Sequence, residues 1–253
     1  KRKPTMLVTV LTLQVHDAAG LGVAAAAGAI GSATLAVQSA TAPPRRHREG
    51  GPRDAMPWGA LSPLLVASVA LGVLFGSAEV LVVAFTKEHG SPGASGVVLA
   101  LWAAGSLVAG VVVGAVPSPT DQRRRLRGTL LVLTATFVPP LFISDVPWLA
   151  VAMVAAGFMV APTLIAAVSI VELVVPPGRL TEALTWTTTG LAVGVAPGAA
   201  VAGRIVDHQG ASAGFVVPLV ACAVAALVAW TAAPRTPAEI TVVPVPSNHY
   251  PGP

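Results

Sequence analysis

Long apolar stretches alternate along this chain with short segments rich in proline, glycine and arginine. A helix needs about 20 apolar residues to cross the hydrocarbon core of a bilayer. Seven stretches reach or approach that length: Ala18–Val37, Leu61–Phe85, Gly93–Val116, Leu126–Ile143, Trp148–Val171, Ala183–Val206 and Ala211–Ala232. The fourth is the shortest and contains Pro139-Pro140 near its end. The pattern predicts an all-α integral membrane protein with about seven transmembrane helices.

The two ends of the chain follow different patterns. Lys1-Arg2-Lys3-Pro4 precedes a short apolar stretch, Thr5–Val15. A basic start before a short apolar region is typical of a signal peptide, but no convincing small-residue cleavage site follows. We therefore favour the end of a spanning helix for Thr5–Val15. At the other end Pro234–Pro253 contains six prolines, which predicts a disordered tail.

Composition excludes a soluble globule. Hydrophobic residues make up 54% of the 253 residues and charged residues only 10%, whereas a soluble domain carries about 25% charged residues. The formal charge of +4 comes from short basic clusters between apolar stretches, so it predicts membrane orientation and no nucleic acid partner. The single cysteine, Cys222, excludes an intrachain disulfide.

No constellation of residues indicates catalysis. The five histidines lie in connectors or at the ends of stretches, and no pair of them has the spacing of metal ligands. No glycine-rich loop followed by Lys-Ser or Lys-Thr offers a phosphate cradle. We therefore expect no enzyme activity, no metal and no cofactor.

The basic residues predict the orientation in the membrane. Ten lysines and arginines lie in the connectors 40–57 and 118–127, near Arg179 and in the tail, and only Lys87 and Arg204 lie in the opposite connectors. The positive-inside rule places the first group, and with it the C-terminus, in the cytoplasm. Lys1–Lys3 do not fit this alternation.

Glu79 is the ionisable residue deepest within a predicted span. A carboxylate at membrane depth is costly unless it is sheltered, and such residues are often functional. Helical spacing places Glu79 on the face of Gly72, Phe75 and Gly76, so that it should point into the bundle, where it would suit proton coupling or recognition of a cation. The alternative is a hydrated position near the outer interface.

Small and polar residues recur on the faces of other spans. Gly72/Gly76, Gly110/Gly114 and Gly190/Gly194/Gly198 are spaced by four, which favours close helix packing. Pro197 should bend its helix. Thr181, Thr185 and Thr189, with Trp186 beside them, form a stripe that either lines a hydrated cavity or returns its hydroxyls to the helix backbone.

Three segments resemble the major facilitator superfamily. The connector from Gly114 through Asp121 to Arg123, Arg124 and Arg125 resembles the Gly-x-x-x-Asp-Arg-x-x-Arg-Arg loop between that family's eighth and ninth helices, with a longer Gly-to-Asp spacing and Gln122 inserted. Residues 171–184 resemble the turn before the eleventh helix. The sequence Gly190-x-x-x-Gly194-x-x-Pro197-Gly198 resembles the glycine-rich eleventh helix, with a likeness to the drug-efflux branches.

The resemblance implies the domain organisation. Residues 1–39 would be the end of helix five and helix six of a twelve-helix carrier, 40–57 the central cytoplasmic loop, 58–233 the C-terminal six-helix bundle, and 234–253 a cytoplasmic tail. The seven spans would be helices six to twelve. Separately, the abundance of Ala, Gly, Pro and Arg is typical of a bacterium with GC-rich DNA. The implied function is secondary active transport of a small solute across the cell membrane in the direction of efflux, with the proton as a candidate coupling ion.

On the transporter reading we expect this chain to be a truncated carrier, inactive unless it pairs with the missing N-terminal half. The alternative is a non-transporting membrane subunit or a half-transporter partner. A seven-helix receptor or light-driven pump is disfavoured. None of the three lysines lies in the last span for retinal attachment, and the long basic loop follows the first span instead of the fifth.

Overall fold

The computed structural model describes residues 25–26, 28–34, 37, 55–116 and 121–231 of the chain. The chain divides into two compact units, Lys1–Pro52 and Arg53–Pro253, and each is considered by itself. In the first unit every described residue is helical. The predicted helix end Thr5–Val15, most of the loop 40–57, and the tail 234–253 lie outside the described residues.

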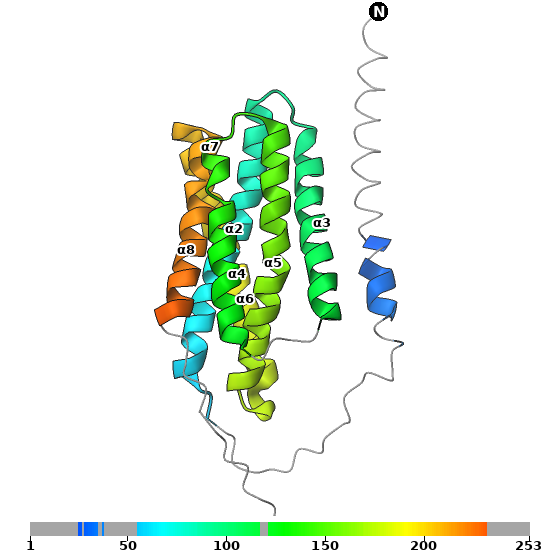
Figure 1. The fold of residues 1–253 in the computed structure, drawn as a ribbon, viewed down its shortest axis with the longest axis vertical. Helices are drawn as coiled ribbons and strands as arrows, with labels where there is room; N and C mark the ends of the chain where they lie inside the picture. The colour runs from blue at the N-terminus through cyan, green and yellow to red at the C-terminus, as the bar shows by residue number, and fades with distance from the viewer. Residues whose placement is uncertain (1–24, 27, 35–36, 38–54, 117–120, 232–253) are drawn as a thin grey trace, which may run out of the picture. The chain divides into compact units, whose positions relative to one another are not determined.

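The second unit is a bundle of helices joined by short turns (Figure 1). The described residues contain no strand, so the fold class is all-α, as predicted. The helices are α2 (Trp58–Glu88), α3 (Ala94–Ala115), α4 (Gln122–Thr136), α5 (Val146–Val174), α6 (Leu180–Gln209), α7 (Ala211–Gly214) and α8 (Val216–Thr231), with 3₁₀ turns at Pro139–Leu141 and Pro177–Arg179.

Five helical segments among the described residues are long and apolar enough to cross a membrane. They are Trp58–Glu88, Ala94–Ala115, Val146–Val174, Pro177–Gln209 and Ala211–Thr231. Each contains most of one predicted span, because the long apolar runs that satisfy a bilayer core also form uninterrupted helices.

The fourth predicted span, Leu126–Ile143, is wrong at both ends. Helix α4 begins four residues earlier, at Gln122, because the carboxylate of Asp121 accepts a hydrogen bond from the backbone N–H of Arg124 at 3.0 Å and so caps the helix start. It ends at Thr136, before Pro139, since proline cannot continue the helical hydrogen bonds. At 15 residues, α4 is not among the five membrane-length segments.

The last predicted span is divided into α7 and α8 at Phe215. Pro218 has no N–H to donate to the carbonyl of Gly214 four residues earlier, so the helix is interrupted there. Phe215 is fully buried and meets the ring of Phe85 edge-on, with the ring centres 6.5 Å apart. The interruption thus places the large aromatic side chain of Phe215 in the core.

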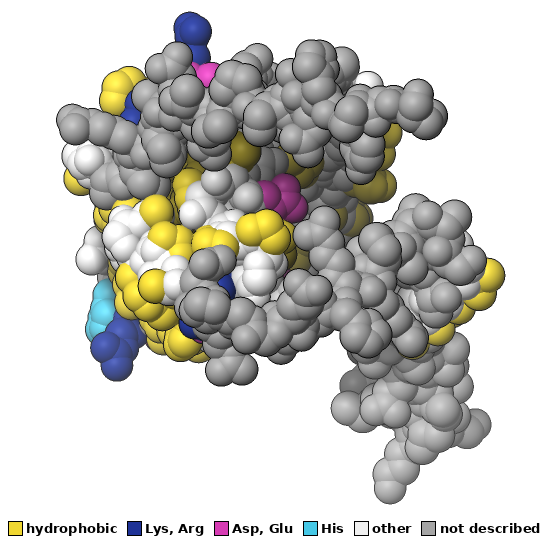
Figure 2. Space-filling model, turned by 90° about the horizontal axis from the view of Figure 1, so that it is seen from below, with side chains coloured by type: hydrophobic (Ala, Val, Ile, Leu, Met, Phe, Trp, Pro, Cys, Tyr) yellow, Lys and Arg dark blue, Asp and Glu magenta, His cyan; other side chains and the backbone are white. Residues whose placement is uncertain are grey.

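Helix α2 organises the packing. It contacts α6 along one side and α8 along another, while α4 lies between α5 and α8, and α3 packs on α5. The core contains fully buried side chains from α2, α4, α5, α6, α7 and α8 and from the segments after α4 and α7, among them Leu74, Phe85, Leu130, Phe137, Met153 and Phe215. Seen from the end at which α2 begins, the described side chains are mostly hydrophobic (Figure 2).

Charged side chains from other helices hold both ends of the α7–α8 segment. At its start the backbone N–H of Ala211 donates to the carboxylate of Glu88, the last residue of α2. At its end Arg127 donates from Nε to the carbonyl of Ala229 at 3.0 Å and lies over the ring of Trp230. An acidic group at a helix start and a basic group at a helix end both complement the helix dipole.

Candidate functional site

A small pocket with three hydroxyl groups lies between α2, α5 and α6. Its volume is about 90 Å³. Ser68 of α2 and Thr187 and Thr188 of α6 provide the hydroxyls. The other lining residues are apolar: Leu64, Leu71, Leu164, Ala167, Val168, Val171 and Leu191.

Each of these hydroxyls donates to a carbonyl of its own helix. Ser68 Oγ donates to Leu64 at 2.8 Å, and Thr187 Oγ1 and Thr188 Oγ1 donate to Leu184 at 2.9 and 3.0 Å. A hydroxyl that donates once keeps lone pairs for accepting. The pocket can therefore accept hydrogen bonds from a bound molecule but, having no ionisable lining residue, provides no acid or base.

Thr185, Trp186 and Thr189, predicted from the stripe, lie on the exposed side of α6 outside this pocket. Thr185 Oγ1 donates to the carbonyl of Thr181 at 2.8 Å. The ring of Trp186 meets the ring of Trp58 edge-on, with the centres 5.9 Å apart and the planes at 72°. This aromatic pair joins the first turn of α2 to the second turn of α6.

Glu79 is exposed instead of enclosed by the described helices. It lies eleven residues, or about three turns, after Ser68 and hence on the same face of α2. Nine residues separate it from Glu88, which puts it about 13 Å below the helix end. An open hollow of about 700 Å³ surrounds it, with Lys87, Glu88 and Val206 on its walls.

The predicted glycines of α6 form a close seam with α2. A Cβ built on Gly194 would lie 2.1 Å from the carbonyl oxygen of Val69, and one on Gly198 would lie 2.3 Å from that of Val73. Gly72 and Gly76 are equally close to the α6 backbone. Gly190 has only ordinary contacts, and Pro197 faces a groove on the other side of the seam.

The two helices run parallel along this seam. Gly72 meets Leu191, and Gly76, one turn later, meets Val195, one turn later on α6. Backbone contact of this kind requires residues without side chains on both helices. The seam therefore fixes α6 on α2 and determines which of its threonines face the pocket.

A second seam, which the glycine spacing did not single out, joins α3 to α5. A Cβ on Gly157 would lie 2.2 Å from the carbonyl oxygen of Trp102, and one on Gly105 would lie 2.7 Å from that of Val154. These glycines are isolated in the sequence, so no repeat marks them. By contrast Gly114 has nothing within 4 Å and Gly110 has one contact at 3.4 Å.

The arginine-rich start of α4 contains residues in different surroundings. Asp121 caps the helix, Arg124 is exposed and Arg125 is partly buried. Nη2 of Arg123 is buried and has no hydrogen-bond partner among the described residues. Burial, together with the neighbouring charge of Arg127, lowers the pKa of Arg123. Residues 117–120, between Gly114 and Asp121, lie outside the described residues.

Metal-binding and polar networks are sparse in this unit. Among the described residues, no group of three or more His, Cys, Asp and Glu could hold a metal ion. The buried hydroxyls of Ser77, Thr86 and Thr163 each donate to a carbonyl within their own helix, at 2.7 to 3.1 Å.

Comparison with known families gives a match over most of the second unit. A family model described as Major Facilitator Superfamily matches residues 64–246, which include the pocket, Glu79 and both glycine seams. No curated protein and no solved structure matches the chain significantly.

Proposed function

Since this chain belongs to the major facilitator superfamily, a family of membrane transporters, we propose that it forms the C-terminal half of a carrier that exports a small solute by alternating access. In such carriers the site lies between two halves that rock against each other. The resemblance of the Gly190–Gly198 segment to drug-efflux branches supports the outward direction.

The hydroxyl pocket between α2, α5 and α6 is the observation that carries the proposal. It combines three acceptor hydroxyls with a wall of leucine, valine and alanine side chains. Such a lining suits a solute that is mainly apolar and carries one or two hydrogen-bond donors. Its volume of about 90 Å³ accommodates part of a solute, so the remainder would extend toward Trp58 and Trp186.

Glu79 would provide the coupling. A carboxylate exposed on α2 about 13 Å below its end would be costly against lipid, so we infer that its face borders water or another protein surface. Its alignment with Ser68 places it on the side of α2 that carries the pocket. There it would bind and release a proton, or pair with a cationic group of the solute, as the halves move.

Exposed faces of α3 and α6 support a second half. Each of these helices meets the bundle mainly along its glycine seam and leaves large apolar side chains uncovered, including Leu107 and Val111 on α3 and Val193 on α6. A bundle of six further helices would cover part of these faces. The 253-residue chain alone would then be inactive.

A transport assay tests the proposal. Inside-out membrane vesicles containing the full carrier, in which this chain is joined by an N-terminal half, would be energised with a pH gradient, and uptake of ethidium, a lipophilic cation, would be followed by fluorescence. Thr188→Val removes one acceptor hydroxyl at nearly constant volume and should raise the KM about 2- to 10-fold, the effect of one lost hydrogen bond. Thr129→Val, which removes a hydroxyl of α4 outside the pocket, is the control.

The same assay separates the alternatives. Robust flux through liposomes that contain only the 253-residue chain would overturn the half-carrier proposal while leaving the family unchanged. A non-transporting subunit would give no flux of ethidium in any preparation and would instead copurify with a partner in fixed ratio. Equal KM values for Thr188→Val and Thr129→Val would remove the pocket from the pathway.

A further inference from the structure

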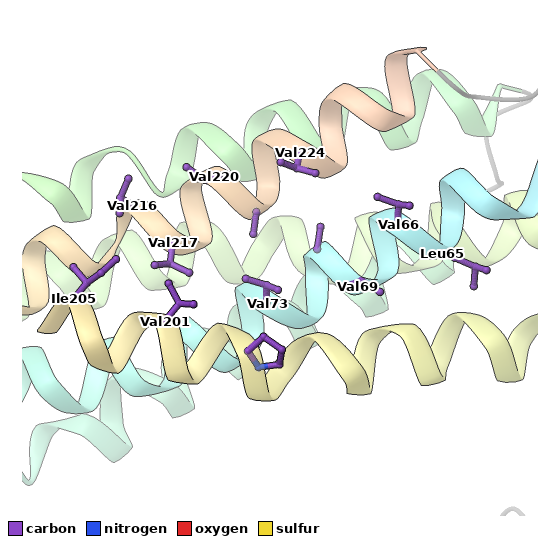
Figure 3. A pocket seen from close by; sticks show the side chains of 13 residues that line it. Leu65, Val66, Val69, Val73, Val201, Ile205, Val216, Val217, Val220 and Val224 are labelled. Atoms are coloured by element: carbon purple, nitrogen blue, oxygen red, sulfur yellow. The ribbon is translucent and has the colours of Figure 1, made fainter.

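A long apolar groove runs along the opposite side of the α2–α6 seam. Its volume is about 660 Å³, and side chains of α2, α6 and α8 line it (Figure 3). The groove exists because α6 and α8 both pack on α2 but hardly contact each other. Thirteen residues line it and all are apolar: Leu65, Val66, Val69, Ala70, Val73, Pro197, Val201, Ile205, Val216, Val217, Val220, Ala221 and Val224.

The groove extends over about half of the length of α2, which has 31 residues and is about 46 Å long. From Leu65 to Val73 it follows α2 for about 12 Å, and from Pro197 to Ile205 it follows α6 for another 12 Å. Gly198 lies against Val73, so the second stretch continues where the first ends. The groove is therefore about 24 Å long in total, which is more than the thickness of the hydrocarbon of one leaflet, about 15 Å.

The lining side chains cannot close the groove. Eight of the thirteen are valines, which are short and have one strongly preferred rotamer in a helix. Val201 and Val220, on facing walls, remain 49% and 53% exposed. No flexible methionine or aromatic ring is present to fill the space, and the seam glycines hold α6 in place. An unfilled groove in contact with a bilayer is filled by hydrocarbon.

The chemistry of the lining specifies the occupant further. Ordinary ligand pockets of 300–1,000 Å³ carry a few polar groups that orient the ligand, and this groove has none among its lining residues. Its occupant is therefore held by shape along its length and needs no polar group there. A fatty acyl chain meets that description.

Basic side chains lie at one end of the groove. Arg204 and His208 are seven residues after Pro197 and Val201 and so share their helix face. Arg204 is exposed and forms no ion pair with any described residue. The distribution of arginines assigns this end to the outer side of the membrane, where the phosphate of an outer-leaflet lipid would meet it.

We propose that the groove between α6 and α8 binds one acyl chain of an outer-leaflet phospholipid whose phosphate lies against Arg204. The bound chain completes the packing between two helices that otherwise meet only through α2 and the turn at Gly210. The proposal is independent of the transported solute, because it concerns the side of α2 that faces away from the hydroxyl pocket.

Photochemical labelling in the membrane tests the proposal. Membranes containing the protein would receive phosphatidylglycerol with a diazirine in its acyl chain, and after illumination the labelled peptides would be identified by mass spectrometry. Label is expected on Val201, Val220 and their neighbours in the groove. Val220→Phe fills the groove and should abolish most of that label, while Arg204→Gln should weaken it.

The matched control is Val132→Phe on α4, a valine that is 49% exposed and lies outside the groove. This variant should retain the label of the unchanged protein, and both variants should keep Cys222 protected from maleimide, which shows that they fold. Label spread evenly over the faces around Val132 and Val220 would mean ordinary solvation by lipid and would overturn the proposal. Absence of label from the groove, with cross-links to protein in its place, would assign the face to another helical bundle.

Discussion

The backbone N–H of Ala211 lies 3.0 and 3.1 Å from the two carboxylate oxygens of Glu88, a residue 123 positions earlier in the chain. The carboxylate at the end of α2 thereby caps the start of the last membrane-length segment, which consists of α7 and α8. Gly210, which precedes Ala211, has a φ of +85°, a conformation that favours glycine. The turn after α6 is shaped so that Glu88 can reach the free N–H.

Removing this cap should destabilise the bundle. Glu88→Ala is expected to lower the free energy of unfolding by about 0.5–2 kcal/mol, the usual cost of losing a helix cap. Cys222, the single cysteine, is buried, so the rate at which it reacts with a maleimide dye on heating reports unfolding in detergent. The temperature at which half of the Cys222 thiol has reacted gives a midpoint for unfolding. Glu172→Ala, which changes an exposed carboxylate at the end of α5, should leave this midpoint unchanged.

The α2–α6 seam should not tolerate a methyl group. In Gly194→Ala the new Cβ would lie 2.1 Å from the carbonyl oxygen of Val69, so the two helices must move apart. We expect a loss of about 1–3 kcal/mol, as for an overpacked core, measured by the same thiol reaction.

Gly203→Ala is the matched control on the same helix, because nothing lies within 4 Å of its added Cβ. That substitution should be neutral or stabilise α6 by up to about 1 kcal/mol, since alanine favours helix over glycine. Equal midpoints for Gly194→Ala and Gly203→Ala would contradict the seam.

Two arginines four residues apart should behave differently. Arg127→Met removes the hydrogen bond to Ala229 and the cation over Trp230, and should cost about 0.5–2 kcal/mol. Arg123→Met removes a guanidinium with a buried, unpartnered Nη2 and a pKa lowered by burial and by Arg127.

The Arg123 variant should therefore be as stable as the unchanged chain or more stable. The midpoints of thiol reaction for the two methionine variants, measured side by side, check both expectations. A larger loss of stability for Arg123→Met than for Arg127→Met would contradict this expectation. It would mean that the guanidinium of Arg123 makes a stabilising contact.

Glu79→Gln should separate coupling from binding. If Glu79 carries the proton, solute transport by the variant should lose its dependence on the pH gradient while solute exchange without a gradient persists. Uptake into vesicles over a range of external pH gives both quantities. Glu172→Gln, another exposed carboxylate, should keep the gradient dependence, and an unchanged pH profile in Glu79→Gln would exclude it from the mechanism.

Hydropathy predicted the long helices that a membrane would require. It did not predict the first and last residues of helices where capping groups or prolines determine them. The runs that became α2, α3, α5 and α6 are long and bounded by glycine, proline or charge. Helix α4 starts before its apolar run because Asp121 caps an arginine-rich first turn. The break at Phe215 follows from Pro218 inside an otherwise continuous apolar run.

The candidate pocket was harder to predict. The first half of α6 carries threonines on several of its faces. A spacing of four residues selected Thr185 and Thr189, but it does not identify the face that meets the bundle. The glycine seam does: Thr187 is seven residues before Gly194 and lies on nearly the same face. The exposure of Glu79 depends on how the other helices pack around α2, which no local pattern contains.

Because the backbones of α2 and α6 touch at four glycines, these two parallel helices are expected to shift as one body. Ser68, Thr187 and Thr188 would then keep their mutual distances through any rocking motion. The third wall of the hydroxyl pocket belongs to α5, which contacts α6 only slightly. In the proposed carrier, admission of a solute would therefore depend on how far α5 moves from this pair, and Leu164 and Val168 would line the opening.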